Sequence, residues 1–331
     1  MRVQFHPDGI YLEAIDLWLD PQVSKPHAWV SHAHSDHARY YSSVLFGTAT
    51  TLEIYRMRWP ENPDSPQSLH PVAFGESWTW KGAKLTAYPA GHILGAAQLL
   101  VEYGGERLVY TGDLKLNPPM LGEETQILPA DHLIIESTFG LPIYRFLSRE
   151  EAQVKIVKFA RECLEDGAVP VFTGYPLGRG QEIVHALLSA GVPTSVHGAI
   201  AKYIPVYERK GYRFEGWSEY KANDIKSKAL VLVPGMTRNL EARGVDMRSA
   251  YVSGWASMDN ARLRAGAEML IPYSDHAGFD ELLALVQGSG ARRVDVVHGY
   301  TEAFAKILRD RGIHAQAPQQ AAARVSEEES V

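Results

Sequence analysis

Four side chains able to bind a metal ion occur within six residues near the start of the chain. They are His32, His34, Asp36 and His37, in the segment VSHAHSDH at 30–37. Three neutral imidazoles and one carboxylate form a borderline-soft set of nitrogen and oxygen donors, which suits Zn²⁺ and also accepts manganese or iron. A single histidine is more often an ordinary core or surface residue, but four such donors together have little else to do. The segment predicts a metal-binding loop.

The elements around this loop predict how the donors are held in place. Residues 28–30 form a short apolar run, which predicts a strand that brings the ligands to a sheet edge. Further donors stand at the ends of other predicted strands, namely Asp20, His92, Asp113, Glu136, His276 and His298. Each one alone is compatible with ordinary turn chemistry, as in the Thr-Gly-Asp turn that ends at Asp113.

A different pattern fills the middle of the chain. Helical periodicity over 149–166 is followed by a strand at 169–172, a glycine-rich loop and a second helix, and strands and helices keep alternating to about residue 253. This alternation predicts a small parallel α/β domain inserted into the first one.

Candidate phosphate contacts lie in this middle segment. Gly178 and Arg179 stand where the glycine-rich loop enters a helix, and Arg262 and Arg264 follow a Ser-Gly-Trp turn. Over 141–266 there are 18 Lys and Arg against 13 Asp and Glu, a balance of +5, whereas the remaining residues carry 15 against 26, a balance of −11, in a chain of net charge −6. A basic wall would attract phosphates. A plain connecting loop and a solvated charged surface are the alternatives.

Length and composition set the broad class of protein. With 331 residues and 45% hydrophobic content, the chain can bury a large core, and we expect two domains. The single cysteine, Cys163, cannot form an internal disulfide, which fits a reducing compartment. The sequence shows no charged-then-apolar leader and no apolar run long enough to span a bilayer. We expect a cytoplasmic protein with no membrane partner, and the oligomeric state stays open.

The motifs resemble those of the metallo-β-lactamase superfamily, whose members are mostly two-metal hydrolases. The HxHxDH pattern at 32–37 is similar to its second motif, and the residues that match its first, third and fourth motifs are Asp20, His92 and Asp113. Residues 136–140 (ESTFG) resemble motif A of the nucleic-acid-processing branch, the β-CASP proteins. The matches to motifs B and C of this branch are His276 and His298.

Longer strings look like the bacterial ligase-associated exonuclease group, which is also described as mRNA 3′-end processing factors. They are ESTFGLPIY at 136–144, VSGW at 252–255, SDHAGFDEL at 274–282 and VHGYT at 297–301. Two segments depart from that group. The first strand reads IDLWLDP at 15–21 where the group has a string like GDFYIDP, and an arginine run after VSGW is thinned at 260–264.

The resemblance implies an α/β fold, namely a metallo-β-lactamase αββα sandwich with an inserted parallel α/β β-CASP domain. The implied boundaries are 1–140 for the first part of the sandwich, 141–266 for the insertion, 267–317 for the return to the sandwich and 318–331 for a disordered tail.

The resemblance also implies roles for the candidate residues. One metal would be held by His32, His34 and His92, and the other by Asp36, His37 and His298. Asp113 would bridge the two metals, Asp20 would brace the loop, and Asp36 would count among the catalytic residues as well. His276 would stay free of metal and protonate the leaving oxygen, with Glu136 orienting its ring. The implied cofactors are two divalent transition metals, Zn²⁺ first and Mn²⁺ as the alternative.

The implied function is hydrolysis of nucleic-acid phosphodiester bonds by a hydroxide activated by two metals. The leading hypothesis is an exonuclease of DNA repair that acts on single-stranded DNA or RNA beside an ATP-dependent DNA ligase and a helicase. RNA processing of the mRNA 3′-end type, by exo- or endonuclease action, is the nearest alternative. An inactive scaffold subunit would have lost ligands, which this sequence keeps, and a small-molecule hydrolase would lack motif A.

Overall fold

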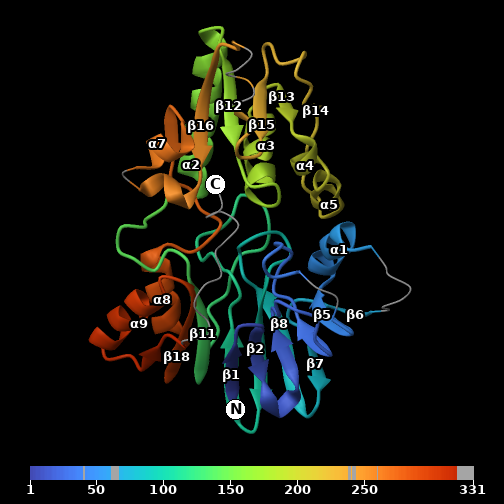
Figure 1. The fold of residues 1–331 in the computed structure, drawn as a ribbon, viewed down its shortest axis with the longest axis vertical. Helices are drawn as coiled ribbons and strands as arrows, with labels where there is room; N and C mark the ends of the chain where they lie inside the picture. The colour runs from blue at the N-terminus through green and yellow to red at the C-terminus, as the bar shows by residue number, and fades with distance from the viewer. Residues whose placement is uncertain (40–41, 61–66, 238–239, 241–243, 259, 319–331) are drawn as a thin grey trace. The chain divides into compact units, whose positions relative to one another are not determined.

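The computed structural model describes the chain except for residues 40–41, 61–66, 238–239, 241–243, 259 and 319–331. The chain divides into two compact units (Figure 1). Unit 1 consists of Met1–Pro142 together with His276–Ser330, and unit 2 is Ile143–Asp275. The tail predicted at 318–331 lies, apart from Pro318, outside the described residues. Among the helices that are described, none is both long and apolar enough to cross a membrane.

The first sheet of unit 1 has the strand order β1-β2-β3-β4-β5-β6. Its strands are β1 (Val3–His6), β2 (Gly9–Leu12), β3 (Leu17–Leu19), β4 (His27–Trp29), β5 (Val44–Thr48) and β6 (Ser68–Val72). Strands β1, β2 and β3 pair antiparallel in that order, and β3, β4, β5 and β6 pair parallel. The parallel strands end at the same edge of the sheet, so the loops that follow β3 and β4 are brought together there.

Two features of this sheet differ from the sequence prediction. The alternation over 9–20 predicts one strand, but it is broken by a short 3-10 helix, η1 (Glu13–Ile15), and by Asp16 in a left-handed conformation with φ of 46°. The Pro-, Asn- and Ser-rich stretch at 60–71 predicts a loop; residues 61–66 lie outside the described residues, and Ser68–Val72 forms β6, which pairs with β5. Pro71 lacks an amide hydrogen and is accommodated because β6 is an edge strand.

The second sheet of unit 1 has the order β19-β18-β11-β10-β9-β8-β7. Its strands are β7 (Ser77–Trp80), β8 (Ala83–Pro89), β9 (Ala97–Tyr103), β10 (Glu106–Tyr110), β11 (His132–Ser137), β18 (Arg293–Gly299) and β19 (Ala315–Gln316). Strands β7 to β10 form an antiparallel meander, and β10, β11, β18 and β19 are parallel. The predicted strands at 84–88, 98–103, 107–110 and 133–135 all lie within this sheet.

The two sheets of unit 1 pack face to face over one apolar core. Leu12, Leu19 and Trp29 from the first sheet share this core with Leu99 and Ile134 from the second. The outer faces carry the helices α1 (Ala49–Arg58), α8 (Phe279–Ser289) and α9 (Thr301–Asp310). Helix α1 packs on β5 and β6, whereas α8 packs on β11, and α9 packs on β11, β18 and β19 (Figure 1). Unit 1 is therefore a layered α/β structure with helices on both sides.

Unit 2 contains a single parallel sheet of order β14-β13-β15-β12-β16-β17. Its strands are β12 (Val169–Thr173), β13 (Thr194–Val196), β14 (Ser218–Glu219), β15 (Ala229–Leu232), β16 (Met247–Val252) and β17 (Met269–Ile271). The helices around it are α2 (Arg149–Glu165), α3 (Arg179–Ser189), α4 (Gly198–Ala201), α5 (Ile204–Arg209), η2 (Gly254–Ser257) and α7 (Ala261–Ala265). Helix α2 begins at a capping box made by Ser148 and Glu151.

Strand β17 corrects the predicted boundary of the middle segment. The sequence predicts that the chain returns to the first domain at residue 267, but β17 pairs with β16 in the sheet of unit 2. The backbone of this short strand completes the edge of that sheet, and unit 1 resumes at His276. The apolar run Met269–Ile271 does not reveal which of two sheets it joins.

Candidate metal centre

The predicted metal loop follows β4 in unit 1. The amide of Val30 donates to the carbonyl oxygen of Phe46 at 2.9 Å, which prolongs the pairing of β4 with β5. Beyond it, the amides of His37 and Ala38 both donate to the carbonyl oxygen of His34, at 3.2 and 2.9 Å. With this turn, the donor atoms of His32, Asp36 and His37 lie within 4.8 Å of one another. All four predicted ligands of the loop are buried.

His92 and Asp113 reach the loop because a glycine stands directly before each of them. Gly91 and Gly112 adopt φ angles of 70° and 57°, which favour glycine. A Cβ on Gly91 would lie 2.3 Å from a backbone oxygen of a neighbouring loop, and one on Gly112 would lie 2.6 Å from Cβ of Ser31. Conformation and space therefore both require glycine, and the close approach places His92 and Asp113 beside the loop.

Donor atoms within 4.8 Å of one another form two groups that share His32, and Asp113 belongs to a further group with Glu136 and His276. The first group is His32, His34 and His92, and the second is His32, Asp36 and His37. Within the first, Nδ1 of His34 lies 3.0 Å from Nε2 of His92. Two nitrogens about 2.0 Å from the same tetrahedral Zn²⁺ would be separated by roughly 3.3 Å, so this spacing fits shared coordination.

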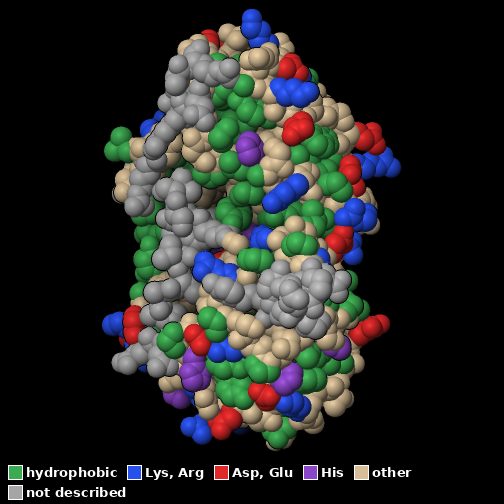
Figure 2. Space-filling view, turned by 45° about the vertical axis from the view of Figure 1, so that its right-hand side comes forward, with side chains coloured by type: hydrophobic (Ala, Val, Ile, Leu, Met, Phe, Trp, Pro, Cys, Tyr) green, Lys and Arg blue, Asp and Glu red, His purple; other side chains and the backbone are tan. Residues whose placement is uncertain are grey.

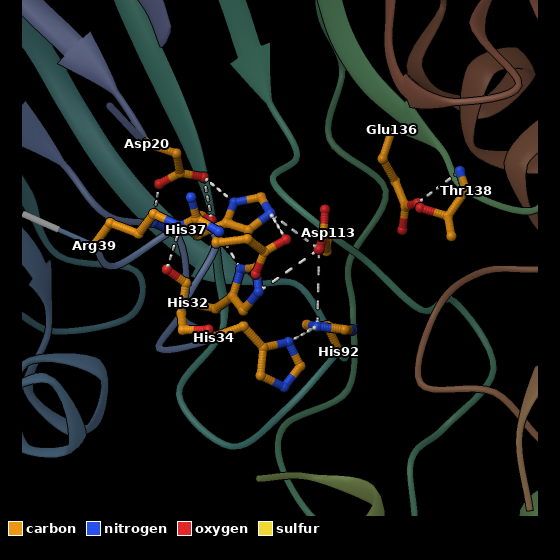
Figure 3. A network of polar contacts seen from close by, with 12 residues as sticks. Asp20, His32, His34, His37, Arg39, His92, Asp113, Glu136 and Thr138 are labelled. Atoms are coloured by element: carbon orange, nitrogen blue, oxygen red, sulfur yellow. Dashed lines mark hydrogen bonds and ion pairs between the residues drawn. The ribbon is translucent and has the colours of Figure 1, made fainter. Parts of the chain in front are cut away.

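Asp113 lies between the two groups (Figure 3). Its Oδ2 is 3.2 Å from Nε2 of His37, 3.6 Å from Nε2 of His32 and 4.0 Å from Nε2 of His92. Nε2 of His32 is buried and has no hydrogen-bond partner among the described residues. A buried polar nitrogen normally has a hydrogen-bond partner. Nε2 of His32 has none there and faces the carboxylate of Asp113, so its position fits that of a metal ligand.

His298 approaches the cluster from the end of β18. Its ring centroid lies 5.3 Å from that of His37, although its nitrogens fall outside the two tighter donor groups. The residue adopts a left-handed backbone with φ of 57°, and its carbonyl oxygen accepts a hydrogen bond from Oγ of Ser137. A side chain other than glycine rarely takes this conformation, so the surroundings hold His298 in it.

Asp20 holds the loop through hydrogen bonds of its carboxylate. Its carboxylate accepts hydrogen bonds from the amide and the hydroxyl of Ser31 at 2.7 and 2.6 Å, and from the hydroxyl of Tyr110 at 2.8 Å. It also lies 2.7 Å from Nδ1 of His37. A proton held on Nδ1 by this contact leaves Nε2 of His37 as the ligand atom, and Nε2 is the nitrogen that faces Asp113.

The cluster carries a surplus of negative charge. Burial opposes protonation of His37, but the carboxylates of Asp113, Asp36 and Asp20 outweigh it and raise the pKa of His37 to about 10. Burial, together with neighbouring imidazoles, holds the pKa of His32 well below its ordinary value. Burial would raise the pKa of Asp113, but His37 above all holds it well below its ordinary value. Divalent cations would neutralise this field, so the electrostatics fit a metal centre.

His276 and Glu136 form a separate pair beside the cluster. Nδ1 of His276 lies 2.9 Å from Oε1 of Glu136, and the ring of His276 is 4.5 Å from that of His92, centroid to centroid. The same carboxylate accepts from the amides of Leu114 at 3.0 Å and Thr138 at 3.1 Å. Glu136 is fully buried at the end of β11, so these contacts fix its carboxylate and, through it, the ring of His276.

The structure corrects the prediction that Arg179 binds phosphate. Its guanidinium is 1% exposed and pairs with Glu182 at 3.2 Å and with Asp275 at 3.0 Å, all within unit 2. It also lies over the ring of Tyr273, whose hydroxyl donates to Glu182. Two carboxylates already neutralise the charge of this arginine inside the fold. The sequence could not show this, because Asp275 lies far along the chain from Arg179.

The other predicted phosphate contacts also lie in unit 2. The amide of Gly178 donates to Oε1 of Gln181 at 2.7 Å, so it serves the start of α3. Arg262 donates to the carbonyl oxygen of Glu268 at 2.6 Å on the surface of unit 2. Arg264 is part of α7, and its side chain lies outside the described residues. On the face shown in Figure 2, Lys and Arg are interspersed with Asp and Glu and form no continuous basic wall.

Several residues that support the site were missed at the level of sequence. Ser31 and Tyr110 hold Asp20, and Gln22 donates to the carbonyl oxygen of Asp36 at 2.8 Å. Tyr110 and Ser31 directly precede the predicted Thr-Gly-Asp turn and the first loop histidine, so their proximity to the motifs was the available signal. Gln22 gave none.

Comparison with known proteins places this fold and site among nucleases. No family model matches the chain. A "Probable DNA ligase" of Opitutus terrae is 33% identical over 312 residues, which cover 93% of this chain and 30% of that protein. An "RNase J-like protein" of Methanocaldococcus jannaschii is 28% identical over 174 residues, covering 47% of this chain and 41% of that protein. "Cleavage and polyadenylation specificity factor subunit 3" of Dictyostelium discoideum is 30% identical over 185 residues, covering 47% and 24%.

The chain thus spans less than half the length of each of these three relatives. A solved structure, that of a protein of unknown function from Enterococcus faecalis V583, matches with a TM-score of 0.62 and 13% identity, covering 91% of this chain and 81% of that one. This match concerns the fold alone.

Fold and site together define the class: an α/β protein with a buried histidine and aspartate cluster at the ends of its strands. The three relatives identify the family within this class of protein. The chain belongs to the β-CASP nuclease family of the metallo-β-lactamase superfamily.

Proposed function

We propose that the chain is a metal-dependent nuclease that hydrolyses phosphodiester bonds of nucleic acid. The observation that carries the proposal is the position of Asp113 between two groups of buried donors, with the His276–Glu136 pair beside them. Hydrolysis of a phosphodiester needs charge neutralisation at the phosphoryl oxygens and a proton for the leaving oxygen. The donor groups and the pair would meet these two needs separately.

The ligand assignment follows the family resemblance and agrees in part with the two donor groups, because His32 belongs to both groups and His298 to neither. In this proposal one cation is held by His32, His34 and His92, the other by Asp36, His37 and His298, and Asp113 contributes to both. Zn²⁺ suits the set best, and Mn²⁺ is the second choice. When bound, such cations lower the pKa of a water molecule and neutralise charge that develops on phosphate.

The chain's own residues would supply orientation and the proton. Asp20 holds the tautomer of His37 through Nδ1. Glu136 accepts from Nδ1 of His276, which leaves Nε2 as the nitrogen that delivers a proton to the leaving oxygen. The negative charge of Glu136 favours the protonated ring before transfer. His276 would thus act as the general acid and Glu136 as its orienting partner.

The layered unit 1 supports assignment as the αββα sandwich of the superfamily, and the parallel sheet of unit 2 supports assignment as the β-CASP insertion. The relative that covers 93% of this chain bears the name of a DNA ligase, which favours DNA repair and a ligase partner. The names "RNase J-like protein" and "Cleavage and polyadenylation specificity factor subunit 3" favour RNA as the second candidate substrate. All seven predicted ligands are present, which disfavours a scaffold without activity.

The test uses end-labelled single- and double-stranded DNA and RNA, each incubated with Zn²⁺ or Mn²⁺ and resolved by product length. We expect metal-dependent cleavage that Asp113→Asn abolishes, because this substitution removes the shared charge. A ladder from one end would indicate exonuclease action, and internal fragments would indicate endonuclease action. Absence of cleavage of every strand by metal-loaded protein would overturn the proposed function.

A further inference from the structure

Two arginines are attached to the backbone of the metal loop. Nε of Arg39 donates to the carbonyl oxygen of Ser35 at 3.1 Å, and Nη1 of Arg58, the last residue of α1, donates to the carbonyl oxygen of Ala33 at 3.0 Å. The two carbonyls flank His34, one of the proposed ligands. The structure therefore carries two guanidinium groups on the same three-residue stretch of the loop.

Within the described residues, no carboxylate forms an ion pair with either of these two arginines. Among the ion pairs of the described residues, neither Arg39 nor Arg58 has a carboxylate partner. Some surface arginines elsewhere in the chain do, as Arg248 does with Glu268 and Arg292 with Asp131. A carbonyl oxygen orients a guanidinium but leaves its full positive charge and its other N–H donors in place.

Their exposure and position suit an anionic ligand. Arg39 is exposed and Arg58 is partly exposed. Figure 3 draws Arg39 and Glu136 at opposite ends of the metal cluster. A group bound by Arg39 would therefore sit on the side away from His276, the proposed proton donor. In a chain of net charge −6, two uncompensated cations at the cluster are the feature that a polyanion would meet there.

We propose that Arg39 and Arg58 form a phosphate subsite for the backbone of the nucleic-acid strand, on the side of the cluster away from the leaving oxygen. This inference rests on the proposed nuclease function. A guanidinium with free N–H groups binds a phosphodiester through two parallel hydrogen bonds, which a lysine cannot reproduce. In this proposal, phosphate is bound by Arg39 and Arg58. The sequence predicts this role for Arg179, but the guanidinium of Arg179 forms ion pairs with Glu182 and Asp275 inside unit 2.

Helix α9 offers matched controls. Arg311, which follows the last residue of α9, is exposed and donates Nη1 to the carbonyl oxygen of Ile307 at 3.1 Å, a bond of the same length as that from Nε of Arg39 to Ser35. Arg309 donates Nη1 to the carbonyl oxygen of Ala315 at 3.0 Å in a partly buried bond. This bond matches that from Nη1 of Arg58 to Ala33 in donor atom, length and partial burial. Within unit 1, Figure 1 draws α9 and α1 on opposite sides of the strands. Alanine at 309 or 311 removes the same charge and the same kind of bond away from the loop.

The experiment measures binding of a fluorescent single-stranded oligonucleotide to zinc-loaded His276→Ala protein, in which strand cleavage is suppressed. Arg39→Ala and Arg58→Ala should each weaken binding about tenfold, the loss expected for a hydrogen bond to a charged group. Each should also lower the slope of log K against log salt by about 0.7, the value for one phosphate contact on a single strand. Arg309→Ala and Arg311→Ala should change neither quantity. Arg39→Lys should keep the salt slope and still bind more weakly.

Two further measurements separate the subsite from a structural role. Metal content should be unchanged in Arg39→Ala and Arg58→Ala, and hydrolysis of bis-p-nitrophenyl phosphate, measured with His276 intact, should fall less than strand cleavage, because this substrate carries a single phosphate. Loss of metal from either variant would mean that the arginines only brace His34, and equal weakening by the α9 variants would mean that only net charge matters. Both results overturn the subsite. A parent protein that neither binds nor cuts strands overturns the proposed function itself, whereas one that does so with no change in either variant overturns the subsite alone.

Discussion

His276 and His298 are both buried histidines near strand ends, yet their neighbours give them different chemistry. His276 contacts the carboxylate of Glu136, whereas the ring of His298 lies against that of His37. We expect His298→Ala to bind close to one metal per chain in place of two. His276→Ala should keep both metals while turnover falls roughly 10²–10⁴-fold, the usual effect of losing a proton-transfer group. Elemental analysis and single-turnover cleavage measure the two outcomes.

The leaving group provides the control for this pair of variants. A leaving group of low pKa needs little protonation, so a substrate such as bis-p-nitrophenyl phosphate should restore much of the activity of His276→Ala and none of that of His298→Ala. The roles would be exchanged if His276→Ala lost a metal while His298→Ala retained two.

Arg179 shows how a candidate ligand contact becomes a structural residue. Its guanidinium is paired with Glu182 and Asp275 and is 1% exposed. Removing one partner of a buried ion pair leaves uncompensated charges and costs about 3–5 kcal/mol. We expect Arg179→Ala to lower the free energy of unfolding of unit 2 by this order, measured by urea titration. Unchanged stability combined with weaker binding of nucleic acid would restore the phosphate role that the sequence predicts.

At the scale of elements, the loop after β10 connects the proposed metal cluster to His276, the proposed proton donor. The amide of Leu114 donates to Glu136, and its carbonyl oxygen accepts from the amide of Ala277 at 2.6 Å. Glu281, in the first turn of α8, accepts from the amides of Leu116 and Asn117, both at 2.8 Å. The loop that carries Asp113 is thereby fastened to the segment that carries His276.

We therefore expect Glu281→Ala to reduce turnover, although Glu281 has no proposed contact with substrate and acts only through the loop that it holds. Supporting residues of this kind typically contribute 10–100-fold to metal affinity or activity, and we expect a loss of about that size. Asn117→Ala is the matched control, because it removes only the side-chain contact to Glu281 at 2.8 Å and keeps both amide bonds. Steady-state kinetics on substrates of differing leaving-group pKa measure the effect. An equal loss for both variants would show that the amide bonds are not what positions the loop.

The sequence predicts the elements whose signal is local and misses those decided by distant packing. The predicted helix at 149–166 and strand at 169–172 match α2 and β12 within a residue or so. The seven candidate ligands could be selected from the sequence because four share one loop and the others stand at or beyond strand ends. By contrast, the sheet that β17 joins and the burial of Arg179 depend on partners distant in sequence. Local patterns carry no information on such contacts.

At the scale of the whole molecule, the two units contain separate spectroscopic and chemical probes. Five of the seven tryptophans lie in unit 1, namely Trp18, Trp29, Trp59, Trp78 and Trp80, and two lie in unit 2, Trp217 and Trp255. The one cysteine, Cys163, is buried in α2 of unit 2. Burial raises the pKa of its thiol to about 11, so little reactive thiolate forms at neutral pH while unit 2 stays folded.

All proposed metal ligands lie in unit 1, so metal binding should stabilise that unit selectively. A ligand at 100 times its Kd adds about 2.7 kcal/mol to the folded state that binds it. We expect Zn²⁺ added to chelator-treated protein to raise the midpoint of the tryptophan emission change on heating, while the rate at which iodoacetamide modifies Cys163 stays the same. An unchanged emission midpoint would contradict a metal centre in unit 1. Equal protection of Cys163 would show instead that the two units unfold as one, because metal bound to one would then hold both closed.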